Sequence, residues 1–191
     1  MKKQISEEEL SKLNASLFKE IEKSSYDEVI RLIKEGAQLE ATNEDGQTPL
    51  ILATSIAISK ACMPNSKITC SSNSVLVVDY LIENSANVNA IDTFGWTAIY
   101  TATAFSIQRT HKSLWLNYDA DPTPKVTEVA KHICEKLLSY GANVHYENNE
   151  GYGPLNEPGY IRQEYESGRI FVHEESSLLE LAGLACIACD L

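Results

Sequence analysis

The segment LIENSANVNAIDTFGWTAIYTA, residues 81–102, decides the fold, because two other segments of the chain repeat its pattern. They are LIKEGAQLEATNEDGQTPLILA, residues 32–53, and LLSYGANVHYENNEGYGPLNEP, residues 137–158. Each segment starts with two apolar residues, soon reaches glycine or serine, and carries a second glycine further on. The second glycines are Gly46, Gly95 and Gly151, so their separations are 49 and then 56 residues. This regular phase predicts a repeated unit that stacks on its neighbours.

Each unit is predicted to contain a pair of helices. The positions three, four and seven residues before Gly36, Ser85 and Gly141, where the second helices are predicted to end, are apolar in every unit, which places them on one helix face. They are Val29, Leu32, Ile33, Val78, Leu81, Ile82, Cys134, Leu137 and Leu138. Thr48 followed by Pro49 predicts the start of a first helix, because threonine caps it and proline suits its first position. Ser6 and Glu9 form a capping-box pattern for an N-terminal helix, whose predicted partner runs from 26 to 35.

The string GQTPLILA at 46–53 resembles the turn and first helix of an ankyrin repeat, and LIENSANVN and LLSYGANV resemble its second helix and exit. This resemblance covers about residues 13–155. It implies an all-α, ankyrin-type solenoid of helical hairpins that forms a single domain over 1–191. The expected parts are an N-terminal capping helix pair (1–36), two repeats (44–90 and 91–147) and a degenerate C-terminal repeat or cap (148–191).

Two departures from the ankyrin pattern are visible in the sequence. The usual ankyrin period is about 33 residues, so the longer periods predict insertions between the two helices of a pair, at 60–73 and 106–123. Ile51, Tyr100 and Asn156 also stand where the family usually has a histidine in the turn motif.

The C-terminal part of the chain allows two interpretations. Residues 160–173 alternate around Glu166-Ser167-Gly168, which indicates a small β-hairpin before a last helix that starts near Ser177. In the alternative interpretation, the chain is a fragment whose next second helix is missing.

Charge and composition restrict the classes of partner. The net charge of −11 disfavours nucleic acid and anionic membranes, because both are bound through lysine and arginine. No apolar run is long enough to cross a membrane, and the N-terminal sequence has no apolar secretory region. We therefore expect a monomeric, cytoplasmic protein. Its acidity favours solubility, and would also steer it toward a partner with a basic surface.

The residues that most resemble a chemical site are Cys186 and Cys189, in a Cys-x-x-Cys pattern. They lack the second ligand pair of a zinc site and lie in an apolar segment, so we interpret them as small core residues. The alternative is a metal- or thiol-dependent enzyme that uses Cys186 and Cys189, or His173. No cofactor, metal or catalytic residue is predicted.

The resemblance implies a non-enzymatic scaffold or adaptor that binds another protein through the concave face and turn tips. An alternative within binding proteins is a bacterial effector that engages a host protein inside the host cell. Phe94, Trp96 and Tyr152 are expected to form an aromatic ridge along exposed turns. Trp115 and Tyr118, with Leu114 and Leu116, either cover the helix ends or anchor a partner. The predicted partner contacts are Asn43, Asp45, Gln47, Asp92, Phe94, Trp96, Asn149, Tyr152, Trp115 and Tyr118.

Overall fold

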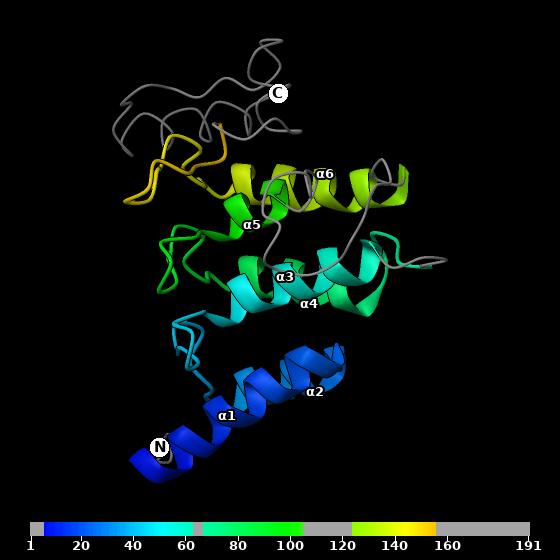
Figure 1. Ribbon diagram of the computed structural model, residues 1–191. Coiled ribbons are helices and arrows are strands. Elements are labelled where there is room, and N and C mark those ends of the chain that lie inside the picture. The colour runs from blue at the N-terminus through cyan, green and yellow to red at the C-terminus, as the bar shows by residue number, and fades with distance from the viewer. Residues whose placement is uncertain (1–5, 63–66, 105–123, 156–191) are drawn as a thin grey trace, which may run out of the picture.

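The computed structural model describes residues 6–62, 67–104 and 124–155, and within these ranges the chain forms six helices and no strand (Figure 1). The described part is therefore all-α, as predicted. The helices are α1 (Glu7–Lys23), α2 (Tyr26–Glu35), α3 (Pro49–Cys62), α4 (Asn73–Glu83), α5 (Ala98–Ala104) and α6 (Pro124–Ser139).

The helices form three consecutive pairs that stack in chain order. α1 contacts α2, α3 contacts α4, and α5 contacts α6. The first helix of the middle pair, α3, also contacts α1 and α5, while its second helix, α4, contacts α2 and α6. The connections that lead from one pair to the next all project from the same side of the stack (Figure 1). The three phased segments thus lie side by side, as the repeat predicts.

The predicted apolar faces form the continuous core of the stack. Val29, Leu81 and Leu137 are completely buried, one in the second helix of each pair. Because each pair is too small to bury its apolar face alone, these side chains are covered largely by neighbouring pairs. The remaining core residues of α3 and α5 include Leu50, Ala57, Ile58 and Ile99.

The predicted helix starts are confirmed by their hydrogen bonds. The Ser6 hydroxyl accepts from the Glu9 backbone N–H at 3.2 Å, and the Ser6 N–H donates to the Glu9 carboxylate at 3.1 Å. α3 begins at Pro49, and the Ile51 N–H donates to the Thr48 hydroxyl at 3.4 Å. Local sequence therefore sets these boundaries, because capping needs only residues a few positions apart.

The connections inside the second and third pairs are only partly described. α3 continues through Lys60 to Cys62, although we expected the insertion to start at 60. The buried residues Ala57, Ile58 and Ala61 explain the extension, because they keep the helix packed on the core. α6 begins at Pro124, directly after the predicted second insertion (106–123). The second insertion (106–123), the C-terminal hairpin (160–173) and the final helix lie outside the described residues.

The Thr54 hydroxyl in α3 leads to a stability prediction. Thr54 is 0% exposed, and its hydroxyl has no hydrogen-bond partner among the residues that the structure describes. Thr54→Val should therefore raise the free energy of unfolding by about 1 kcal/mol, because valine has nearly the same shape and no polar group to desolvate. Urea denaturation followed by circular dichroism measures the change.

Thr101→Val in α5 is the matched control. The Thr101 hydroxyl is also buried, but it donates to the Thr97 carbonyl at 3.0 Å. Removing a satisfied hydroxyl should give no gain, and should lower stability by about 0.5–1.5 kcal/mol. Equal gains in both variants would show that general apolarity, rather than the unpaired hydroxyl, controls stability.

Candidate functional site

Three equivalent turns project from the stack, and we call their combined surface, residues 38–48, 87–97 and 143–153, the turn edge (Figure 1). Each turn is closed by the same pair of backbone hydrogen bonds. In the middle turn, the Asp92 N–H donates to the Trp96 carbonyl at 3.1 Å, and the Gly95 N–H donates to the Asp92 carbonyl at 3.0 Å. The equivalent bonds form at Asn43 in the first turn and at Asn148 in the third.

A side-chain oxygen at the same position braces each turn from within. Asp92 accepts from the backbone N–H groups of Phe94 and Trp96, both at 2.9 Å. Asn43 accepts from Asp45 and Gln47, and Asn148 accepts from Glu150 and Tyr152, at 2.9–3.1 Å. The acceptor oxygens of Asn43 and Asp92 are therefore used within their own turns, and the contact of these residues with a partner stays a prediction.

This brace predicts a specific response to substitution at Asp92. Asp92→Ala should lower the free energy of unfolding by about 1–2 kcal/mol, because two N–H groups lose their acceptor and only partly regain it from water. Asp92→Asn should be nearly neutral, because asparagine makes the same two bonds at positions 43 and 148. Thermal denaturation of the three proteins tests this, and a loss in Asp92→Asn as large as in Asp92→Ala would contradict the role of the brace.

Hydrogen bonds between successive turns fix the spacing of the turn edge. Thr93 donates through its N–H and its hydroxyl to the Asp45 carbonyl, at 3.2 and 2.7 Å. The Asn148 side-chain amide donates to the Phe94 carbonyl at 3.0 Å. At the base of the turns, the Glu40 carboxylate accepts from the Asn87 N–H at 2.7 Å. These bonds hold the three turns in register.

The middle turn presents an aromatic cluster. Phe94 is 62% exposed, and its ring centroid lies 5.6 Å from that of Trp96. Trp96 is half-buried and lies 5.6 Å from the buried ring of Tyr100 on α5. The ring contacts therefore run inward from the tip, and Trp96 supports Phe94 from below. Ile91, 49% exposed, adds apolar surface to the same turn.

The other predicted contacts occupy different environments. Asp45 and Asn149 are exposed, while Gln47 and Tyr152 are half-buried. The Gln47 side-chain oxygen also accepts from the Asn43 amide at 3.1 Å. Trp115 and Tyr118 lie outside the described residues, so both interpretations of that insertion stay predictions.

Asn148 and Ile91 are among the residues of the turn edge that sequence reasoning missed. Asn148, rather than its neighbour Asn149, is equivalent to Asn43 and Asp92, and adding the periods of 49 and 56 residues to position 43 identifies it. Ile91 was missed because nothing in its local sequence separates an exposed isoleucine from a core residue.

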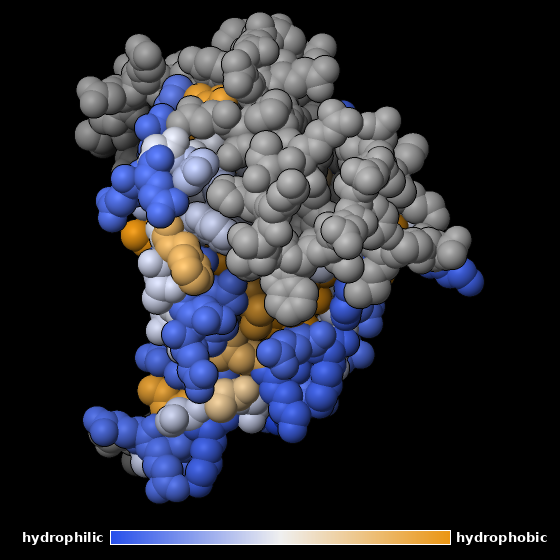
Figure 2. Space-filling model, in the orientation of Figure 1, coloured by the Kyte–Doolittle hydropathy of each residue, from blue (hydrophilic) through white to orange (hydrophobic). Residues whose placement is uncertain are grey.

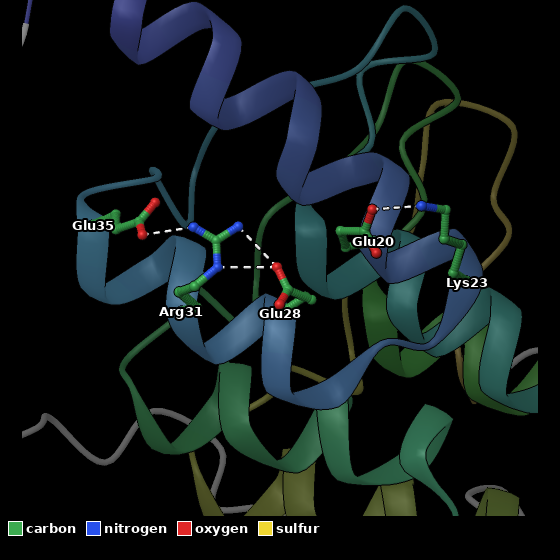
Figure 3. A network of polar contacts seen from close by, with 5 residues as sticks. All are labelled: Glu20, Lys23, Glu28, Arg31 and Glu35. Carbon is green, nitrogen blue, oxygen red and sulfur yellow. Dashed lines mark hydrogen bonds and ion pairs between the residues drawn. The ribbon is translucent and has the colours of Figure 1, made fainter.

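Polar side chains on the helices form a separate network. Arg31 on α2 donates to the Glu28 carboxylate through Nε and Nη2, at 2.9 and 2.8 Å, and to Glu35 at 2.6 Å (Figure 3). Lys23 and Glu20 form a similar pair on α1. Each pair joins residues of one helix at or near its surface, so these pairs stabilise the helices modestly and do not form a site.

The described cysteines do not offer a reactive thiol. Cys134 is completely buried in α6, and burial raises the pKa of its thiol far above the ordinary value. Burial and, to a lesser extent, the nearby Glu128 carboxylate raise the pKa of the Cys70 thiol. Within the described ranges, no group of three or more His, Cys, Asp or Glu side chains could hold a metal ion. Cys186, Cys189 and His173 lie outside these ranges.

Among the helices that the structure describes, none combines the length and apolarity that a membrane span requires.

A comparison with protein-family models matches residues 58–109 to ankyrin repeats. The match begins within α3 and includes α4, the middle turn and α5. No curated protein matches the chain. Ankyrin repeats are generally protein–protein interaction modules and are typically non-enzymatic. Residues 58–109 therefore match the ankyrin repeat family, and the three stacked helix pairs, whose turns share one hydrogen-bond pattern, support an ankyrin-type assignment for the described part of the chain.

Proposed function

We propose that this chain is a non-enzymatic scaffold or adaptor, which binds a partner protein through the turn edge and the adjacent first helices. The observation that carries the proposal is the exposed Phe94 ring on a turn that hydrogen bonds hold in place. Isolated exposed apolar residues are common, but an aromatic ring supported by a second ring at a fixed position can act as an interface anchor.

The rigidity of the turn edge supports this proposal. A partner that binds a loose loop must first order it, and that ordering reduces the affinity. Here the backbone of each turn is braced from within and bonded to its neighbour. The binding surface therefore exists before the partner arrives.

The first helices add an apolar strip beside the turn edge. Leu52 and Ile56, one helical turn apart on α3, are half-buried and border the core. Figure 2 shows apolar surface between the polar turns and a second polar margin. A partner seated on the turns would cover this strip as well.

Site-specific cross-linking tests the proposal directly. A photoreactive phenylalanine analogue at position 94 should cross-link to a partner protein in cells that express the full chain. The same analogue at Lys34, on the exposed face of α2, should give no adduct with that partner. Adducts at position 34 and none at position 94 would overturn the proposal.

Alanine variants separate the turn edge from the second insertion. Phe94→Ala should lose the captured partner while keeping the helical circular dichroism spectrum, because an exposed side chain contributes little to stability. If only Trp115→Ala loses the partner, the binding site lies in the insertion and the proposal is wrong.

A further inference from the structure

The three segments of the turn edge carry acidic residues and no lysine or arginine of their own. Residues 38–48, 87–97 and 143–153 contain no lysine or arginine. They contain six acidic residues: Glu40, Glu44, Asp45, Asp92, Glu147 and Glu150. Of these, Asp92 is buried in its turn brace and Glu40 bonds the next unit, whereas Glu44, Asp45, Glu147 and Glu150 are exposed.

The basic residues of the described ranges lie elsewhere and many are already paired. Lys12, Lys23 and Arg31 pair with carboxylates on their own helices. Lys136 on α6 bonds the Glu83 carboxylate on α4 at 2.6 Å. Within the described residues, no ion pair joins Glu44, Asp45 or Glu150, so these carboxylates keep their charge available to an approaching partner.

The charged and apolar groups alternate along the stack. Glu44 and Asp45 lie on the first turn, and Glu147 and Glu150 lie on the third. The middle turn between them presents the exposed side chains of Ile91 and Phe94. The turn edge is therefore acidic at the first turn, apolar at the middle turn and acidic at the third turn.

This pattern sets the length of a matching partner segment. Packed helices lie about 8–10 Å apart, so the first and third turns are separated by about 16–20 Å. An extended chain rises about 3.3 Å per residue, and it spans that separation in about five to six residues.

We propose that the turn edge binds an extended segment of the partner that has basic residues about six positions apart and a large apolar residue midway between them. The apolar side chain packs against Phe94 and Ile91, and the basic side chains face the carboxylates of the first and third turns. This inference rests on the proposed function and specifies the chemistry of its partner. Charge complementarity selects the segment, while the central ring supplies most of the affinity.

A synthetic peptide provides the probe. It is about nine residues long when extended, has two lysines at each end and a central leucine, and has serine and threonine between them. Fluorescence anisotropy should show saturable binding to the full chain. A peptide with central serine should bind at least about tenfold more weakly, and a peptide with glutamates in place of the lysines should not bind.

Matched variants of the protein assign the binding to the turn edge. Phe94→Ala should weaken binding of the leucine peptide about tenfold or more. Glu44→Gln combined with Asp45→Asn should weaken it about fivefold at low salt, and this difference should shrink at high salt. Glu22→Gln combined with Glu28→Gln removes the same charge from the helix ends opposite the turns. This variant should change the affinity for the leucine peptide less than about twofold, because salt screens distant charges.

Three results would overturn the inference. In the first, the glutamate peptide binds as tightly as the lysine–leucine peptide. In the second, the peptide with central serine binds as tightly as the lysine–leucine peptide. In the third, the Glu22/Glu28 and Glu44/Asp45 variants lose the same affinity for the lysine–leucine peptide. If one of these results is found and a partner still cross-links at position 94, the basic, centrally apolar segment is refuted while the proposed function stands. If position 94 also fails to cross-link, both are refuted.

Discussion

Leu81→Ala should lower the free energy of unfolding by about 2–5 kcal/mol, one of the two largest effects we expect from a single substitution. Leu81 lies in α4 of the middle pair and is 0% exposed. Truncation removes buried apolar surface and leaves a cavity, which the neighbouring helices cannot fully close. Since α4 contacts both α2 and α6, the loss weakens both interfaces of the stack. Chemical denaturation measures the free energy.

Leu76→Ala is the control for the Leu81 prediction. Leu76 lies on the same helix, but it is only half-buried and is not part of the core cluster. The chemical change is identical, so the difference between the variants reports burial alone. We expect Leu76→Ala to cost less than about 1 kcal/mol. A loss equal to that of Leu81→Ala would mean that helix propensity, rather than core packing, determines the stability of α4.

Gly95→Ala should lower the free energy of unfolding by about 2–4 kcal/mol, because two costs combine at this position. Gly95 has φ of +74°, a left-handed conformation that residues with a Cβ rarely adopt. A Cβ there would also lie 2.8 Å from the Cβ of Asn148 on the next turn. The substitution would strain the middle turn and displace the contact that places Asn148 against Phe94. Thermal denaturation gives the stability change.

Gly151→Ala separates these two costs. Gly151 occupies the equivalent position of the third turn with φ of +79°, but a Cβ added there would meet no atom within 4 Å. Only the backbone strain remains, so we expect a loss of about 1–2 kcal/mol. If Gly151→Ala and Gly95→Ala lose the same stability, the close approach between turns does not contribute.

Gly95→Ala also connects stability to function. A displaced middle turn would move Phe94 relative to the carboxylates on either side. Gly95→Ala should therefore weaken binding of the lysine–leucine peptide even at temperatures where the protein remains folded. Gly151→Ala should weaken this binding less. The same anisotropy assay measures both variants.

The periodic features of this protein could be predicted because they are local. Val78, Leu81 and Ile82 share one face through the helical period alone, and the structure buries all three. Ser6, Thr48 and Pro124 mark helix starts through chemistry that acts within one turn. The end of α3 differed from expectation because Ala61 is buried by packing, which its sequence neighbours do not reveal.

The turns of the candidate site could be located from the sequence, but the orientations of their side chains could not. The repeat places Asn43, Asp92 and Phe94 on turns, yet it does not say which side chains point back into the turn. Asp92 is 6% exposed and braces the backbone, whereas Phe94, two residues later, is 62% exposed. Trp96 is half-buried because Tyr100, on the next helix, packs against it.

The sequence by itself determined that stacked helical hairpins form, where most of them begin, and which faces they bury, since periodicity and capping depend on residues close together in the chain. Only the tertiary structure decided that Asn148 bonds the Phe94 carbonyl, and that three turns form one edge with an apolar centre between carboxylates. These relations join residues about 50 positions apart, and the stacking of whole helix pairs sets their geometry.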